Sequence, residues 1–246
     1  MKLVGNTHVG MVRAKNEDTY RYGVLDDGTV WALVCDGMGG VHGGQLASAI
    51  AADMVSEKIK KCYNPAMSVS SLEHLLLSSI ATANVIVYDR GDVDVSLKGM
   101  GTTIVAAVVK GNEACIAHVG DSRAYITDGK EIKQITKDHS LVQEMYDSGK
   151  ISFEEFESHP QKNIITRAMG VNEEVEIDFN FVCVNENEAI ILCSDGLSGL
   201  VDEKEMLRIY CETEFEQLAD RYIEAANKAG GKDNITVVVM KGTGDR

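Results

Sequence analysis

The segment LVCDGMGG, residues 33–40, carries an apolar run directly into an aspartate and a glycine-rich turn. Residues 31–35 are apolar and partly β-branched, which predicts a β-strand. Asp36 follows that strand, so its carboxylate should lie at the rim of a sheet. An Asp-Gly pair is also a common turn, so this segment alone indicates a strand and a turn but no chemistry.

Three further aspartates stand at the ends of apolar runs. Asp121 follows one in AHVGDSR, Asp195 follows one in ILCSDGLSG, and Asp233 precedes one in GGKDNITVVV. Neighbouring strands would bring these carboxylates and Asp36 to one sheet edge, where they repel each other unless a cation neutralises them. Mg²⁺ and Mn²⁺ favour carboxylate, carbonyl and water oxygens, and Gly37, without a Cβ, lets its carbonyl approach such an ion. The pattern therefore favours a hard divalent cation.

Most of the predicted strands are apolar on both faces. The six runs are residues 31–35, 102–109, 114–119, 123–127, 189–194 and 235–240. Strands of this kind are covered on two sides, so the sheets should be packed between other layers. Residues 44–62 and 71–88 repeat apolar side chains at helical spacing and predict two covering helices. A capping box, Ser70 with Glu73, marks the start of the second helix.

The rest of the chain contains one further helix signal and one ambiguous stretch. Thr213 and Glu216 form a capping signal for a helix that should stop at Gly230-Gly231. Between about residues 140 and 162 the pattern is charged and only briefly periodic. This stretch is either a mobile flap or an ordinary pair of surface helices.

The composition fits one domain spanning residues 1–246, because a chain of this length with 44% hydrophobic residues can bury a large core. A formal net charge of −14 argues against nucleic acid or an anionic membrane surface as the main partner. The N-terminus lacks a signal peptide, and the longest apolar run, residues 104–109, is too short to cross a bilayer, so we expect a cytoplasmic protein. The six cysteines include no CxxC pair, and four lie in strand-like runs, which favours buried free thiols and argues against zinc.

A base and two acids come from the segment VRAKNEDTY near the N-terminus. Arg13 offers a planar fork of donors that matches the oxygens of a phosphate, which suits an anionic substrate beside an acidic metal cluster. Taken alone, Arg13 is more typical of a surface residue or a salt-bridge partner than of a phosphate ligand. Glu17 and Asp18, taken alone, would form a solvated face.

Eight segments between about residues 10 and 240 share one order with a known family. They are RAKNEDTY, VCDGMGG, GMGTTIVAAVV, AHVGDSRAYI, TKDHSLV, HPQKNIITRAMG, ILCSDGLSG and KDNITVVV. In this order they resemble the PP2C (PPM) family of metal-dependent protein serine/threonine phosphatases, and the short length resembles the bacterial members that oppose Ser/Thr kinases. The resemblance implies an α+β fold, a four-layer α-β-β-α sandwich with two central antiparallel sheets flanked by helix layers.

The resemblance also implies a metal centre of two Mn²⁺ or Mg²⁺ ions at one end of the sandwich. Asp36 would bridge the two ions, the Gly37 carbonyl would bind one of them, and Asp195 and Asp233 would bind the other. Asp121 corresponds to a position that, together with Asp195, holds a third and weaker metal in bacterial members. Water activated between the two ions would attack the phosphate in line, without a covalent phosphoenzyme.

The remaining site residues follow from the same resemblance. Arg13 would bind the substrate phosphate, and Glu17 and Asp18 would hold water bound to the metals. Met38 stands where animal members carry a histidine proposed as the general acid, and a methionine cannot donate a proton. His159 in HPQKN is one candidate donor, with an ordinary surface histidine as the alternative. The other histidines considered are His42 and His139.

The sequence therefore predicts a protein phosphatase that hydrolyses phosphoserine and phosphothreonine, acts as a monomer, and has phosphorylated proteins, among them a Ser/Thr kinase, as its partners. Two alternatives share the fold. One is a catalytically silent regulatory or binding module, which the loss of a metal aspartate would favour. The other is a phosphatase of small phosphorylated metabolites, which differs only in substrate.

Overall fold

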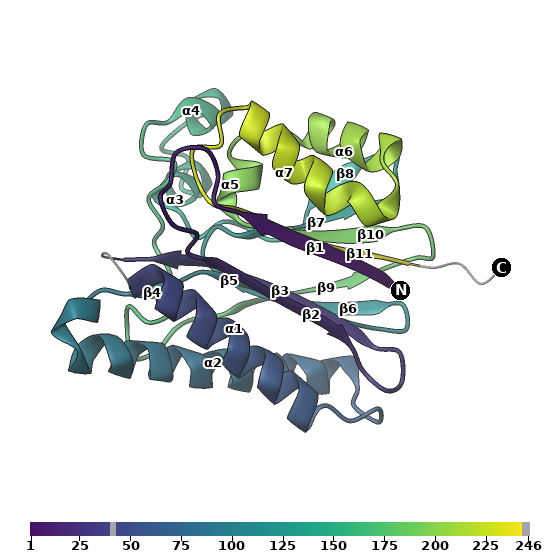
Figure 1. Ribbon diagram of the computed structural model, residues 1–246, viewed down its shortest axis with the longest axis horizontal. Coiled ribbons are helices and arrows are strands. Elements are labelled where there is room, and N and C mark those ends of the chain that lie inside the picture. Colours follow the sequence, from purple (N-terminus) through teal and green to yellow (C-terminus); the bar gives the residue numbers. More distant parts are fainter. Residues whose placement is uncertain (40–42, 243–246) are drawn as a thin grey trace.

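Two antiparallel β-sheets lie face to face in the middle of the molecule, and helices cover the outer face of each (Figure 1). The computed structural model describes residues 1–39 and 43–242. The layers follow the order helix, sheet, sheet, helix, which confirms the predicted α+β sandwich. His42, one of the histidines considered as a proton donor, lies outside the described residues.

The first sheet consists of the strands β1, β11, β10, β7 and β8 in that order, and all its pairs are antiparallel. The bounds are β1 (Lys2–His8), β11 (Ile235–Lys241), β10 (Ala189–Cys193), β7 (Arg123–Thr127) and β8 (Ile132–Gln134). Two amphipathic helices, α6 (Glu203–Glu212) and α7 (Leu218–Lys228), cover its outer face (Figure 1). A short helix, α5 (Asp195–Ser198), lies between β10 and α6 in the chain.

The second sheet follows the order β2, β3, β5, β6 and β9, with the short strand β4 paired to the end of β3. The bounds are β2 (Asp18–Val24), β3 (Val30–Met38), β4 (Gly101–Thr102), β5 (Ile104–Lys110), β6 (Glu113–Val119) and β9 (Asp178–Cys183). The long helices α1 (Gly43–Cys62) and α2 (Val69–Val93) cover it from below in Figure 1, and the 3₁₀ turn η1 (Val95–Leu97) follows α2. Both sheets thus bury one face against helices and the other against each other.

Strand β3 shows why the central strands are apolar on both faces. Its side chains alternate in direction, so Val30 and Val34 enter the core between the sheets, while Trp31 and Leu33 enter the core under α1 and α2. Strand β11 repeats the arrangement on the opposite sheet. The predicted burial of these strands between other layers is confirmed.

All six predicted strands are present. Apart from the two-residue strand β4, the described strands that the sequence did not predict are β1, β8, β2 and β9, which are the edges of the two sheets. Edge strands expose part of their surface, so their sequences are mixed: β2 reads DTYRYGV and β9 reads DFNFVC. The exposure also corrects one expectation about thiols. Cys183 lies on β9 and is exposed, whereas Cys35, Cys115 and Cys193 are buried as predicted.

The helix boundaries differ from two of the predicted capping signals. Helix α2 begins at Val69, and its N-cap is Ser68, whose side chain accepts from the Ser71 amide, so the capping box at Ser70 is wrong. Thr213 ends α6, and a 3₁₀ turn, η2 (Phe215–Gln217), precedes α7. The expected start of a helix at Thr213 is therefore also wrong, because the chain bends there between two helices.

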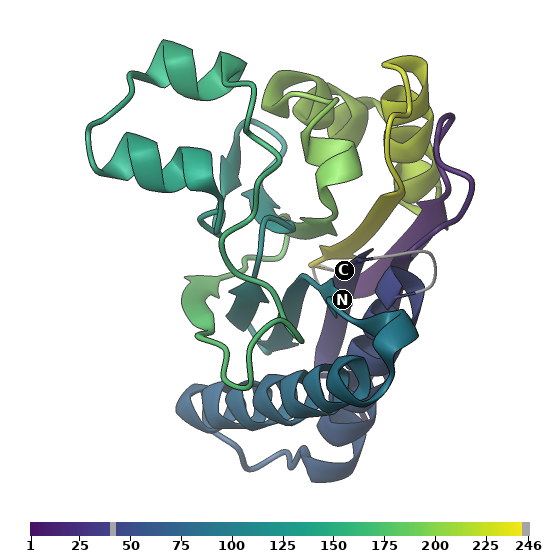
Figure 2. The same cartoon turned by 90° about the vertical axis from the view of Figure 1, so that its left-hand side faces the viewer.

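The stretch from residue 140 to 162 forms two short helices, α3 (Leu141–Asp147) and α4 (Phe153–Ser158), that project from one corner of the sandwich (Figure 2). Tyr146 of α3 packs against Phe153 and Phe156 of α4, with ring centroids 6.2 and 5.4 Å apart. This agrees with the expectation of a helix pair. Its motion as a flap remains a prediction.

Helix α2 is long and apolar enough to cross a membrane if length and composition alone are considered. Its apolar stripe, however, packs against the second sheet, with Leu72, Leu76 and Ile80 fully buried. The helix therefore has the amphipathic character of a layer that covers a sheet.

Candidate functional site

Four carboxylates meet at one end of the sandwich. Asp36 lies near the end of β3, Asp121 between β6 and β7, Asp195 at the start of α5, and Asp233 just before β11. They line a cleft of about 550 Å³. The other lining residues are Arg13, Glu17, Gly37, Met38, Gly39, Thr103, Asn163, Ile165 and Asn234. The structure thus brings together the aspartates that the sequence placed at strand ends.

Mutual repulsion and burial both disfavour the charged forms of these carboxylates. The pKa of Asp36 is raised well above its ordinary value, first by burial and then by the nearby charges of Asp18, Asp195 and Asp121. Burial, followed by the charge of Asp195, raises the pKa of Asp121 to about 8. The pKa of Asp195 is raised by burial and by Asp233. Without a cation, the cluster cannot hold all its negative charges.

Two buried carboxylate oxygens beside Asp36 have no hydrogen-bond donor in the described part of the chain. Among the described residues, none donates to Asp18 Oδ1 or Asp195 Oδ1, although both atoms are buried, and each residue lies beside Asp36. A buried oxygen of this kind costs free energy unless a donor or a cation reaches it. Hard divalent cations prefer carboxylate oxygens, so the donor set fits Mg²⁺ or Mn²⁺.

Main-chain contacts fix the two residues at the floor of the cleft. The Asp36 N–H donates to Thr103 Oγ1 at 3.0 Å, and the Thr102 hydroxyl donates to the Asp36 carbonyl at 2.9 Å. Gly37 donates to the Glu17 carbonyl at 3.2 Å. A Cβ on Gly37 would lie 2.1 Å from the carbonyl oxygen of Gly44. Only glycine fits here, because α1 begins directly against this backbone.

Asp18 is held from the opposite sheet. Its Oδ2 accepts from Ser194 Oγ at 2.8 Å and from Thr236 Oγ1 at 2.6 Å. Burial raises the pKa of Asp18 to about 7, although these two bonds act in the other direction. Asp18 is only 7% exposed, so it lies behind the cleft and not at its surface. Glu17, in contrast, lines the cleft.

Arg13 lies at the mouth of the cleft. Its Nη2 atom is 2.7 Å from Asp233 Oδ2, and its side chain is 52% exposed. The guanidinium is thus within reach of the carboxylates and still open to solvent, as a group that binds an incoming anion must be.

The candidate proton donors lie elsewhere. Met38 lines the cleft, but His159 caps the end of α4, where its Nδ1 accepts from the Gln161 amide at 3.2 Å, and it is not among the described lining residues. His139 lies behind Asp121 and accepts the Gly120 N–H at 3.0 Å. Burial lowers the pKa of His139 to about 4, so this ring is neutral near pH 7.

His118, His139 and Asp178 form a second group of side chains of types that bind metals. Arg167 already supplies the positive charge there, since its Nη1 donates to Asp178 Oδ1 at 2.6 Å and lies 3.1 Å from His139 Nε2. His139 accepts the Gly120 N–H at Nδ1, and its Nε2 faces the positively charged guanidinium of Arg167, which would repel a cation bound at that nitrogen. We infer that this group is structural.

In the metal-free protein, the free energy of unfolding should fall as the pH rises from 6.5 to 8.5. Asp18 and Asp121 have folded pKa values of about 7 and about 8, above the value of about 4 in an unfolded chain. A raised carboxyl pKa contributes stability that is complete below the unfolded pKa and is lost as the pH rises through the folded one. Urea unfolding in EDTA at several pH values measures this slope.

Asp121→Asn is the matched variant for that measurement, because it removes one of the carboxyls whose raised pKa produces the slope. Its stability should depend less on pH than that of the unmodified chain. The lowered pKa of His139 acts in the opposite direction but only below about pH 6.5, so it does not affect the chosen range. Equal stability at pH 6.5 and 8.5 in the unmodified chain would contradict the expectation.

Known proteins with similar sequences and folds were found by comparison. The family model for protein phosphatase 2C matches residues 6–238. The serine/threonine phosphatase stp of Listeria monocytogenes is 38% identical over 238 residues, covering 96% of this chain and 93% of that protein. The protein phosphatase PhpP of Streptococcus pneumoniae is 35% identical over 237 residues, covering 95% and 94%.

Solved structures agree with this relationship. The serine/threonine phosphatase Stp1 from Staphylococcus aureus superimposes with a TM-score of 0.92 at 34% identity, over 99% of this chain and 95% of that one. The catalytic domain of the phosphatase PstP in complex with two manganese ions superimposes with a TM-score of 0.83 at 31% identity, over 97% and 96%. By sequence, fold and the geometry of its cleft, this chain belongs to the protein phosphatase 2C family.

Proposed function

We propose that this chain hydrolyses phosphoserine and phosphothreonine in proteins with the help of two divalent cations. The observation that carries the proposal is the convergence of Asp36, Asp195 and Asp233 on one cleft, where a buried oxygen of Asp195 has no hydrogen-bond donor among the described residues. The two alternatives considered from the sequence gain no specific support. Every carboxylate of the metal centre is present, and the relatives named above are protein phosphatases.

The metal centre would be built from residues at the floor of the cleft. Asp36 would bridge the two ions, with the Gly37 carbonyl on one ion and Asp195 and Asp233 on the other. Asp121, which lines the same cleft beside Asp195, would contribute to a third and weaker site. When bound, Mn²⁺ or Mg²⁺ supplies a water nucleophile that is ionised near neutral pH and neutralises charge on the phosphate.

The protein's own groups orient the reactants. Arg13 at the cleft mouth would bind two phosphate oxygens and hold the phosphorus in line with the attacking water. Asp18 is held from the opposite sheet by Ser194 and Thr236, and with Glu17 it would orient water on the inner side of the cleft. Met38 cannot donate a proton, so the leaving oxygen would take its proton from water in the open cleft.

The substrate class fits the wider surroundings of the site. The cleft is open to solvent at Arg13, as a site for phosphorylated side chains on large proteins must be. Asn163 and Ile165, which follow α4, line the cleft, and we propose that α3 and α4 act as a flap beside it. We propose that residues 1–246 form one phosphatase domain, that the chain acts as a monomer in the cytoplasm, and that a Ser/Thr kinase is among the proteins it dephosphorylates.

The test is a comparison of substrates with and without metal. With Mn²⁺, a phosphothreonine peptide should be hydrolysed with a kcat/KM at least about 100-fold above that for sugar phosphates and nucleotides, since remote peptide contacts contribute to transition-state binding. EDTA should abolish turnover, and added Mn²⁺ should restore it. No metal-dependent turnover of any substrate would support the silent module, and preference for a sugar phosphate would support the metabolite phosphatase.

A further inference from the structure

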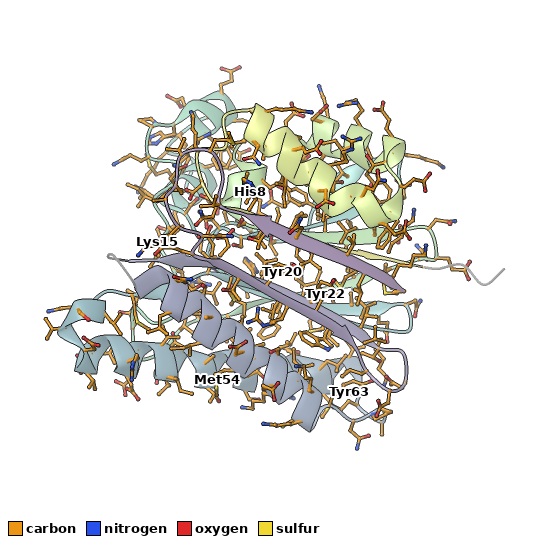
Figure 3. All side chains as sticks on the ribbon, viewed as in Figure 1. His8, Lys15, Tyr20, Tyr22, Met54 and Tyr63 are labelled. Carbon is orange, nitrogen blue, oxygen red and sulfur yellow. The ribbon has the colours of Figure 1, made fainter. Side chains whose placement is uncertain are left out.

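The loop that carries Arg13 is tied to one buried side chain, that of Asn234. This loop, residues 9–17, joins β1 to β2, and Figure 3 labels His8 just before it and Lys15 near its other end. Asn234 Nδ2 donates to the carbonyl of Val9 at 3.0 Å and to that of Lys15 at 2.8 Å. Its Oδ1 accepts from the Glu17 amide at 2.8 Å. One side chain therefore closes both ends of the loop.

The same residue is joined to the carboxylate that Arg13 contacts. The main-chain N–H of Asn234 donates to Asp233 Oδ1 at 2.9 Å, while Arg13 contacts the other oxygen, Oδ2, at 2.7 Å. Asn234 is only 5% exposed. Its main chain thus orients the carboxylate of Asp233, and its side chain sets the loop from which Arg13 reaches that carboxylate.

The tip of the loop, residues 10–12, also contacts the segment before β11. The Met11 amide donates to the Gly231 carbonyl at 2.7 Å, and Gly10 packs so closely that a Cβ there would lie 2.1 Å from the Asp233 carbonyl oxygen. The side chains of Met11 and Val12 are 68% exposed and contribute little packing. The position of Arg13 therefore depends on hydrogen bonds and not on a hydrophobic core. Besides the bonds to residues 231–234, the Gly10 amide donates to His8 Nδ1 at 2.9 Å and Asn16 Nδ2 donates to Thr7 Oγ1 at 2.8 Å.

We propose that Asn234 is a positioning residue for phosphate binding, which acts by holding Arg13 in register with Asp233. The proposal rests on the proposed function of the cleft. An amide is required because the site needs two donors for carbonyls and one acceptor for an N–H at the same time. Aspartate has the same shape, but its second oxygen would face the carbonyls of Val9 and Lys15 without a donor, and the loop would move away.

The test is a double-mutant cycle with Asn234→Asp and Arg13→Ala, assayed at saturating Mn²⁺ with a phosphothreonine peptide and with inorganic phosphate as inhibitor. Each single variant should raise KM and the phosphate inhibition constant about 10-fold, with a smaller change in kcat. In the Arg13→Ala background, Asn234→Asp should add less than about 2-fold, because residues that act through one group are not additive.

A matched control is available in Asn84 of helix α2, which makes the same pattern of hydrogen bonds to another loop. Its Nδ2 donates to the carbonyls of Asn172 and Glu173 at 3.0 and 2.9 Å, and its Oδ1 accepts from the Gly170 amide at 2.7 Å. Asn84→Asp should lower stability in the same way but leave phosphate inhibition unchanged. If Asn234→Asp does not fold, Asn234→Ser takes its place in the cycle, because it removes the two amide donors without adding a charge.

The outcomes separate this inference from the proposed function. If the unmodified chain turns over the peptide and the two substitutions multiply in the double variant, Asn234 does not act through Arg13 and the inference is wrong. A change in phosphate inhibition that is equal in Asn84→Asp and Asn234→Asp would also overturn it. An unmodified chain that shows no metal-dependent turnover or phosphate inhibition would instead remove the proposed function, and the inference with it.

Discussion

An Asp36→Asn variant is expected to hydrolyse a phosphothreonine peptide at least about 1,000-fold more slowly than the unmodified chain, while its metal-free form unfolds at the same or a higher temperature. The two effects have opposite signs for one reason. Asp36 lies among Asp18, Asp121 and Asp195, and its pKa is raised well above the ordinary value. An uncharged amide relieves that repulsion in the metal-free protein, but it removes the carboxylate proposed to bridge the two ions.

The dependence of the unfolding temperature on Mn²⁺ tests whether Asp36 is a metal ligand without measuring catalysis. A ligand that binds the folded state stabilises it in proportion to the logarithm of its concentration, so millimolar Mn²⁺ should raise the midpoint of the unmodified chain. It should have little effect on Asp36→Asn. Calorimetric titration with Mn²⁺ should likewise show high-affinity binding only in the unmodified chain.

Asp202→Asn is the control for this change of charge. Asp202 is the exposed N-cap of α6, where its side chain accepts from the Glu205 amide at 2.8 Å, and asparagine caps a helix about as well. Activity and Mn²⁺ stabilisation should stay at the level of the unmodified chain. If Asp36→Asn kept more than a tenth of the activity, or the full Mn²⁺ effect, Asp36 could not be the bridging ligand.

The strands that the sequence predicted are those that lie inside the sheets. Residues 31–35 and, apart from Thr236, residues 235–240 are apolar throughout because one face packs on helices and the other on the opposite sheet. Strands β1, β2, β8 and β9 lie at sheet edges, where half of each strand meets solvent and the chain needs only some apolar side chains. The local sequence pattern cannot distinguish such a strand from a loop, because pairing with a neighbouring strand determines whether the segment is extended.

The same reasoning explains which site residues could be predicted. Each aspartate of the cluster stands next to an apolar run, so its position at a sheet edge follows from its own segment. The residues that support Asp18 carry no such signal. Ser194 and Thr236 are 176 and 218 positions away from it in sequence, and only the packing of one sheet on the other brings them together. Asn234 adjoins Asp233, but its bonds to residues 9–17 depend on the fold.

Replacing Gly37 by alanine should reduce turnover about 100-fold and lower the free energy of unfolding by about 1–3 kcal/mol. A Cβ at this position would lie 2.1 Å from the carbonyl oxygen of Gly44 and 2.5 Å from that of Glu17. Both obstacles are backbone atoms, the first in the opening turn of α1 and the second just before β2, so neither can rotate away. The backbone at Gly37 must shift instead, and with it the carbonyl proposed as a metal ligand.

Urea unfolding and peptide turnover at several Mn²⁺ concentrations test this expectation, with Gly91→Ala as the control. Gly91 lies in α2, where a Cβ would meet the flexible Met100 side chain at 3.3 Å and the Leu97 carbonyl oxygen at 3.4 Å. Alanine is a better helix former than glycine by about 1 kcal/mol, so this variant should be as stable as the unmodified chain or more so. Gly37→Ala should need more Mn²⁺ for half-maximal turnover, because its displaced carbonyl holds the ion less well. If it lost stability but kept the same Mn²⁺ dependence, the Gly37 carbonyl would be a packing element and not a ligand.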